Sequence, residues 1–192
     1  MSSLKADFNE LLERIKRGRE FGHASFEPIF YLVFPPEQIL KVKRETPAWI
    51  HRLRNEGWEV ETLSIAEQVA DIIDKTSPPI KKIWLAADQK APLAWDKTNT
   101  SLANAISNGA LQARIEVKLA EMEGKPKAIL LVTDLEALHP YTRIGVIEGK
   151  LLGKFSVPTV FLYPGVRTGK TRLKFLGFYP DDGNYRSVHV GG

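Results

Sequence analysis

Hydrophobic positions in the first third of the chain predict a helix, a buried strand and a second helix. The apolar residues between 4 and 15 fall on one stripe at helical spacing, with Ser2 or Ser3 placed to cap the start and Gly18 to end it. Residues 29–34 form an unbroken apolar run closed by two prolines, which is typical of a buried strand. The next helix ends near Gly57, and Pro47 must kink or restart it.

The middle of the chain continues the alternation of strands and helices. Residues 58–63 predict a strand, and Ser64 with Glu67 three residues later forms a capping box that opens the next helix. Residues 80–87 have helical spacing, although a strand over 83–87 is an alternative. The Ala-rich stretch 101–123 predicts one long helix. The apolar run 128–132, ending in Thr133 and Asp134, has the pattern of a central parallel strand buried on both faces.

The last fifty residues predict one more helix and then strands. Residues 140–153 are expected to be helical, and three glycines at every fourth position (Gly145, Gly149 and Gly153) suggest close packing against a sheet. Residues 157–163, 172–179 and 185–190 predict strands joined by turns too short for helical crossovers. We therefore expect antiparallel C-terminal strands on a mixed, mostly parallel sheet. The prediction is a three-layer α/β fold with helices on both faces, in a single domain spanning 1–192.

Composition indicates a globular chain and excludes the kinds of site that depend on cysteine. Hydrophobic residues make up 43% and charged residues 26% of the 192 residues. Cysteine is absent, which excludes disulfide frameworks, iron–sulfur clusters and thiol catalysis. No apolar run approaches the roughly 20 residues that span a bilayer, and the N-terminus lacks the apolar core of a signal peptide. We expect a cytoplasmic protein with no membrane partner.

The charge is unevenly distributed along the chain. Residues 149–192 hold seven basic and two acidic side chains, whereas the rest of the chain is nearly balanced. A stretch of one sign can attract nucleic acid or an acidic protein surface. It is also a common way for a strand-rich segment to remain solvated, so nucleic-acid binding by this basic C-terminal third is the alternative rather than the favoured interpretation.

Residues 165–171 resemble a phosphate-binding loop, with Gly165, Gly169 and Lys170 in suggestive positions. The glycines are separated by three residues instead of four, and the following segment is strand-like rather than helical. We therefore interpret Gly165 and Gly169 as turn residues of a hairpin-like connection, and ATP hydrolysis is disfavoured.

One carboxylate occupies a position where open α/β sheets bind ligands. Asp134 follows the carboxyl end of the predicted central strand, and Arg143 in the next helix is expected to reach it. Asp134 is either a metal ligand, ribose ligand or base, or a structural acceptor for loop amides or Arg143. Since the sequence offers no second candidate close by for a metal site or an acid/base pair, the structural role is favoured. The four histidines lack metal-ligand spacing, and His139 is the one with a polar neighbour in Asp134.

The predicted terminal strands carry aromatic and basic residues in alternation. Protein interfaces concentrate aromatic residues and arginine at their centres. The candidate partner-binding residues are Arg172, Lys174, Phe178, Tyr179, Tyr185 and Arg186. This pattern favours a binding module over an enzyme.

Several motifs occur in an order that resembles a known family. They are an early Phe-Tyr-Leu-Val-Phe-Pro-Pro-Glu strand, His-Pro-Tyr-Thr-Arg after Asp134, Val-Pro-Thr-Val-Phe-Leu-Tyr-Pro-Gly ending at Gly165, Arg-Leu-Lys-Phe-Leu-Gly from Arg172, and a closing Asp-Asp-Gly-Asn-Tyr-Arg. The chain thereby resembles the BrxB proteins of bacteriophage exclusion (BREX) systems. Gly183-Asn184 and His139 depart from the family pattern.

The resemblance implies a non-catalytic adaptor of an anti-phage defence complex, with no cofactor. The expected partner is the PglZ protein, which is alkaline-phosphatase-like. The larger assembly is expected to include the system's ATPase and DNA methyltransferase. A third possibility is a small enzyme or nucleotide-binding protein that works near Asp134.

Overall fold

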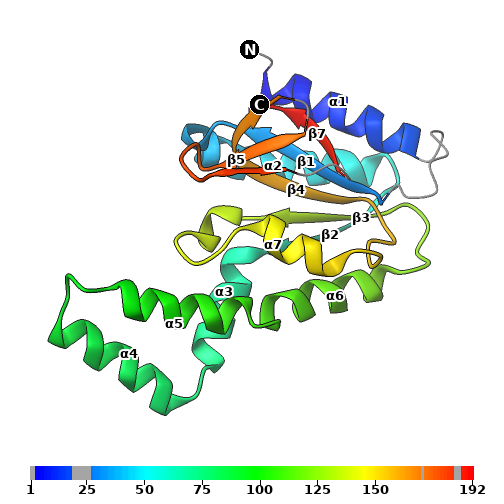
Figure 1. Cartoon of the computed structure of the whole chain (residues 1–192). Helices are drawn as coiled ribbons and strands as arrows, with labels where there is room; N and C mark the ends of the chain where they lie inside the picture. The colour runs from blue at the N-terminus through cyan, green and yellow to red at the C-terminus, as the bar shows by residue number, and fades with distance from the viewer. Residues whose placement is uncertain (1–2, 19–26, 170, 184–186) are drawn as a thin grey trace.

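The computed structural model describes residues 3–18, 27–169, 171–183 and 187–192 (Figure 1). The helices are α1 (Leu4–Arg17), α2 (Ile39–Asn55), α3 (Ile65–Lys75), α4 (Pro78–Lys90), α5 (Asp96–Ser107), α6 (Ala110–Met122) and α7 (Ile144–Glu148). Short 3-10 helices are η2 (Pro36–Gln38), η3 (Leu135–Leu138) and η4 (Gly149–Leu151). The strands are β1 (Ile29–Phe34), β2 (Glu59–Ser64), β3 (Ala128–Thr133), β4 (Thr159–Thr168), β5 (Arg172–Phe175), β6 (Asp181–Gly183) and β7 (Val188–Gly191).

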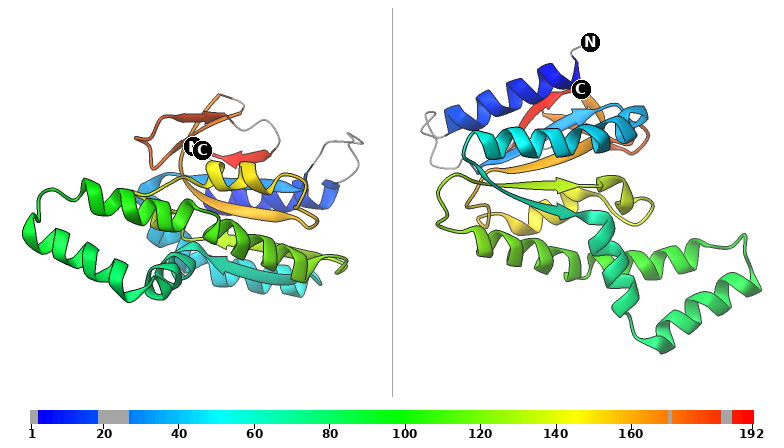
Figure 2. Two further views of the ribbon diagram at one scale, coloured as in Figure 1. Left: turned by 60° about the horizontal axis from the view of Figure 1, so that its bottom comes forward. Right: turned by 180° about the vertical axis from the view of Figure 1, so that it is seen from behind.

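Five strands form a parallel sheet in the order β2-β3-β4-β1-β7. Strand β1 lies inside it, between β4 and β7, and all six of its residues are buried. Its odd-numbered residues face the cluster formed with α3, α6 and α7, and its even-numbered residues face the cluster formed with α1 and α2. Figure 2 shows helices on both sides of the sheet, so the predicted three-layer α/β fold is confirmed.

Local signals placed several elements correctly. The hydroxyl of Ser3 accepts a hydrogen bond from the Ala6 amide and caps α1, whereas Ser2 lies outside the described residues. The hydroxyl of Ser64 accepts from the Glu67 amide, as the predicted capping box requires. Helix α2 continues through Pro47 without restarting.

The expected single helix over 101–123 is wrong. It is divided into α5 and α6 at Asn108 and Gly109. Gly109 has a φ of +108°, which right-handed helical backbone cannot accommodate, and the Asn108 side chain accepts from the Ala110 amide at 3.3 Å. Helix α4 is helical throughout, so the alternative strand over 83–87 is excluded. Figure 1 shows α4 projecting beyond the rest of the molecule.

The helix expected over 140–153 is shorter than predicted. Residues 140–143 form a loop, and α7 with η4 covers 144–151. The predicted packing of the three glycines against the sheet is also wrong. A Cβ added to Gly149 would meet nothing within 4 Å, and one added to Gly145 would meet only the Asp182 carboxylate, at 3.7 Å.

The C-terminal strands follow the antiparallel prediction in part. Strand β5 is antiparallel to β4 and to β6, but β7 is parallel to β1 at the far edge of the sheet. Gly169 has a φ of +77° between β4 and β5, as expected of a hairpin turn. Gly165 is not a turn residue. It lies within β4, where an added Cβ would collide with the carbonyl oxygen of Lys174.

Candidate functional site

Asp134 lies where the sequence predicted, directly after β3 at the carboxyl edge of the sheet. Its φ of +60° is a left-handed conformation that Asp tolerates better than most residues. Its Oδ2 accepts hydrogen bonds of 2.7 Å from the hydroxyls of Ser64 and Thr133. Its Oδ1 lies 2.7 Å from Nζ of Lys43 in α2. One carboxylate thereby joins the ends of β2 and β3 to α2.

These contacts favour a structural role for Asp134. Burial acts to raise the pKa of Asp134, but hydrogen bonds from Lys43, Thr133 and Ser64 outweigh it and hold the pKa below its ordinary value. A carboxylate with a lowered pKa and both oxygens engaged is a poor general base at neutral pH. Lys43 also contacts Glu136 at 2.6 Å, so the ammonium is shared between two carboxylates.

The expected pairing of Arg143 with Asp134 does not occur. Arg143 precedes α7 in extended conformation, and its Nη1 lies 2.9 Å from Oδ1 of Asp182 in β6. It also donates to the carbonyl oxygen of Pro180 at 3.3 Å. His139 likewise contacts Tyr179 rather than Asp134, with Nδ1 2.7 Å from the hydroxyl. The neighbours predicted for both side chains are therefore wrong, because the loop 139–143 turns toward the C-terminal strands.

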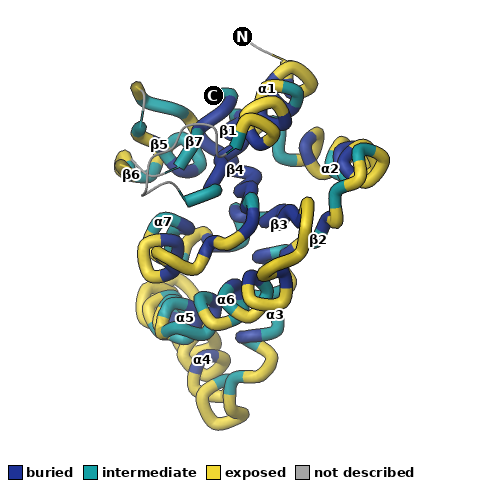
Figure 3. Tube along the Cα trace, turned by 90° about the vertical axis from the view of Figure 1, so that its right-hand side faces the viewer, coloured by how far each residue is buried: buried dark blue, intermediate teal, exposed yellow. Residues whose placement is uncertain are grey.

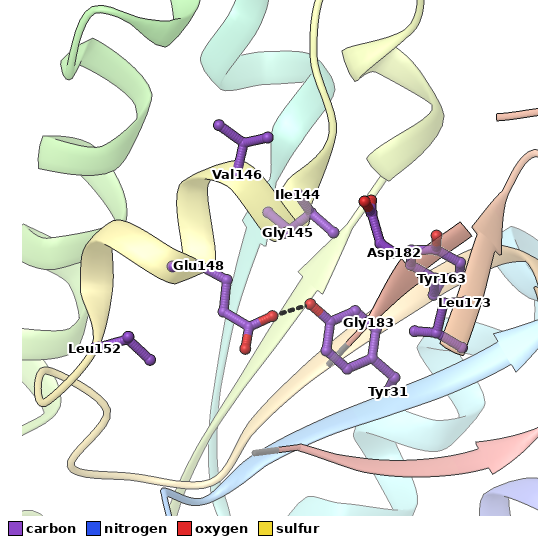
Figure 4. Close-up of a pocket in the computed structure, with 11 residues that line it drawn as sticks. Tyr31, Ile144, Gly145, Val146, Glu148, Leu152, Tyr163, Leu173, Asp182 and Gly183 are labelled. Carbon is purple, nitrogen blue, oxygen red and sulfur yellow. Dashed lines mark hydrogen bonds between the residues drawn. The ribbon is translucent and has the colours of Figure 1, made fainter. Parts of the chain in front are cut away.

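A cavity of about 410 Å³ lies between α7, the sheet and β6 (Figure 4). The Tyr31 hydroxyl donates a hydrogen bond to Oε2 of Glu148 on one side of it, and Asp182 and Tyr163 line the other side. Glu148 is 4% exposed, so its carboxyl group is held almost out of water. Tyr31 and Glu148 are 117 residues apart, and no local pattern in the sequence could have paired them.

Burial dominates the electrostatics of this cavity. It raises the pKa of Tyr163, and the nearby Asp182 carboxylate raises it further. Burial also raises the pKa of Asp182 itself, and Arg143 lessens the rise. Phenols and carboxylates together can hold a cationic group, but two carboxyl groups and two phenols do not by themselves define a reaction.

A buried histidine packs beside the cavity. The His189 ring contacts Tyr31 edge-on with centroids 5.4 Å apart, and its Nε2 lies 2.9 Å from the Ser187 hydroxyl. Burial, assisted by the nearby Arg167, lowers the pKa of His189 to about 4. His189 is therefore neutral at physiological pH and acts as a packing residue.

Two of the predicted partner-binding residues lie in an aromatic cluster formed by His139, Phe178 and Tyr179, in which His139 and Phe178 are exposed and Tyr179 is half-buried against the core. Phe178 is 62% exposed and stacks on Tyr179 with centroids 4.9 Å apart. The His139 ring meets both rings edge-on, and Arg143 lies over the Tyr179 ring at 6.0 Å. The cluster follows β5, which carries Arg172 and Lys174. Tyr185 and Arg186 lie outside the described residues.

The basic C-terminal third does not form one surface among the residues described. Lys154 pairs with Glu116 at 2.8 Å, and Lys150 donates to the carbonyl oxygen of Ser107. Arg167 donates to the carbonyl oxygens of Gly169 and His189. Lys170 is outside the described residues. Because these basic side chains are dispersed, the structure gives little support to the nucleic-acid alternative. That alternative remains a prediction.

Within the described ranges, no group of three or more His, Asp and Glu side chains could hold a metal ion. In that same part of the chain, no helix is both long and apolar enough to cross a membrane.

The fold and these sites define a three-layer α/β protein with an exposed aromatic surface on an antiparallel extension of its sheet. Residues 61–190 match the family described as BREX protein BrxB. The chain belongs to this family and is a component of a BREX phage-defence system. Comparison with the curated proteins and with the solved structures gave no match.

Proposed function

We propose that this BrxB-family protein is a non-catalytic adaptor that binds the PglZ-type, alkaline-phosphatase-like protein of its BREX system in the cytoplasm. The larger assembly would include the system's ATPase and DNA methyltransferase. The observation that carries the proposal is the exposure of Phe178 on its stacked partner Tyr179. An aromatic pair held rigid by its neighbours loses little side-chain entropy when a partner covers it, which is the property of interface hot spots.

Arg143 and Arg172 support the same surface. The guanidinium of Arg143 lies against the Tyr179 ring and is fixed by Asp182, while Arg172 is exposed on the neighbouring strand. Arginine beside exposed aromatic rings is enriched in protein interfaces. The engagement of Asp134 by Lys43, Ser64 and Thr133 supports an adaptor over an enzyme working at that edge of the sheet.

The test is co-purification of the chain with the PglZ-type protein after co-expression, in buffer of low ionic strength. Phe178→Ala and Tyr179→Ala should each weaken the association by at least tenfold, because truncation of a hot-spot residue costs roughly 2 kcal/mol or more. Leu40→Ala is the matched control, since Leu40 is 69% exposed on α2 and lies outside the aromatic cluster. Failure of the native chain to associate under gentle conditions would contradict the proposal.

A further inference from the structure

Exposed apolar side chains gather on the projecting part of the molecule. We define the α4–α5 arm as residues 78–97, which comprise α4, the connection 91–95 and the start of α5. Within the described residues, five of the eleven large apolar side chains that are exposed lie on this arm: Ile80, Ile83, Leu85, Leu93 and Trp95. Leu93 is 94% exposed and Ile83 65%. Figure 3 shows α4 almost entirely exposed at the end of the molecule away from β5 and β6.

The inner side of the arm is built to hold it in place. Trp84 is buried, and its Nε1 donates to the Ser101 hydroxyl at 2.7 Å. The Thr98 hydroxyl donates to Asp88 at 2.8 Å, and Lys81 donates to the carbonyl oxygen of Asp74. Ile80, Ile83 and Leu85 are therefore presented by an ordered helix, and Leu93 and Trp95 by the connection that follows it. Ile80, Ile83 and Ala87 follow one exposed stripe at helical spacing.

The charges around the apolar residues are unbalanced. Lys82, Lys90 and Lys97 are exposed, and among the described residues none of these ammonium groups lies within ion-pair distance of a carboxylate. Two carboxylates also lie on the arm, Asp88, which accepts a hydrogen bond from the Thr98 hydroxyl, and Asp96, which is exposed. With Lys81 counted, the four lysines of the arm outnumber these two carboxylates. An apolar surface bordered by unpaired lysines is complementary to an apolar surface bordered by carboxylates.

We propose that the α4–α5 arm is a second docking surface, which binds a protein of the same defence system through apolar side chains bordered by Asp or Glu. A second copy of this chain fits less well, because a two-fold contact would bring the same lysines together. A membrane fits less well too, since three unpaired lysines are fewer than the four to eight that mark lipid-binding clusters. The arm is separate from the aromatic cluster at Phe178, so the chain would join two partners.

The test measures binding of the purified full-length chain to each other protein component of the same BREX system, one at a time. The apolar variant is Ile83→Ser with Leu93→Ser and Trp95→Ser. The charge variant is Lys82→Glu with Lys90→Glu and Lys97→Glu. Leu40→Ser and Lys41→Glu on α2 are the matched controls, and circular dichroism with thermal unfolding verifies folding.

Both arm variants should weaken binding of one component by at least tenfold, while the α2 controls leave it unchanged. If that component is the PglZ-type protein and Phe178→Ala has no effect, the arm is supported and the aromatic cluster is not. Equal binding of all components by native and variant chains would overturn the inference. The inference would also be overturned if the arm variants abolished self-association of the chain, or its binding to phosphatidylcholine–phosphatidylserine vesicles, while every component bound native and variant chains equally.

Discussion

The ammonium of Lys43 lies 2.7 Å from Oδ1 of Asp134 and joins α2, on one face of the sheet, to the carboxyl end of β3. The Lys43 side chain is 46% exposed, so this ion pair resembles a surface salt bridge and contributes at most about 1 kcal/mol. The hydroxyls of Ser64 and Thr133 donate to Oδ2, the other oxygen of the same carboxylate. Hydrogen bonds to a charged group contribute roughly 1.5–3 kcal/mol each.

These magnitudes predict which substitution around Asp134 lowers the free energy of unfolding more. Ser64→Ala should lower the free energy of unfolding by about 2 kcal/mol, because it removes a donor to Asp134 and the N-cap of α3 together. Lys43→Met should cost less than about 1 kcal/mol. Urea unfolding at neutral pH measures both, and a larger cost for Lys43→Met than for Ser64→Ala would contradict the assignment of roles.

The lowered pKa of His189 predicts how the stability of the chain depends on pH. Its pKa in the folded chain is about 4, against an ordinary value of 6.5, so below pH 6.5 the unfolded chain binds a proton that the folded chain does not. The contribution of His189 to stability is complete above pH 6.5 and is lost as the pH falls toward 4, by about 3 kcal/mol in all.

His189→Gln tests this dependence, because glutamine retains hydrogen-bonding capacity and does not titrate. The free energy of unfolding of the variant, followed by urea denaturation between pH 7 and pH 4, should fall less steeply than that of the native chain. His51→Gln on the exposed side of α2 is the control. Parallel curves for the native chain and His189→Gln would show that His189 is not the titrating group.

Gly165 and Gly149 have opposite surroundings: the backbone approaches Gly165 closely, whereas the space around Gly149 is open. Gly165→Ala should destabilise the chain by about 1–3 kcal/mol, because the added Cβ collides with the Lys174 carbonyl oxygen and the Tyr163 ring. Gly149→Ala should be neutral or stabilise by up to about 1 kcal/mol, since Gly149 has helical backbone angles and open space around it. Thermal unfolding of the pair is the measurement, and a stable Gly165→Ala chain would refute the close approach within β4.

Nucleic-acid binding has a quantitative test. Only Arg172 and Lys174 lie together on β5 among the basic residues described after Gly149, so binding to duplex DNA should be weak. A plot of log binding constant against log salt concentration should have a slope no steeper than about −2, since each neutralised phosphate adds roughly −0.9. Filter binding of the native chain and of Arg172→Ala measures it. A slope of about −5 or steeper would restore the nucleic-acid module as the favoured function.

Signals that act over a few residues were readable in the sequence. The unbroken apolar run 128–132 identified a strand buried on both faces, and Ser64 with Glu67 identified a helix start. The break between α5 and α6 had such a signal as well, in Asn108-Gly109, a dipeptide typical of turns. The Ala-rich composition on either side obscured it.

The sequence by itself determined the α/β class, the buried strands and the position of Asp134 at the end of β3, because periodicity, caps and strand ends are set by neighbouring residues. Only the tertiary structure decided that Lys43 rather than Arg143 meets Asp134, that Tyr31 meets Glu148, and that β7 returns to pair with β1 in parallel. These relations depend on which strands become neighbours, and sheet order is fixed by packing between segments far apart in the chain. The aromatic cluster depends equally on the path of the loop 139–143 toward Tyr179.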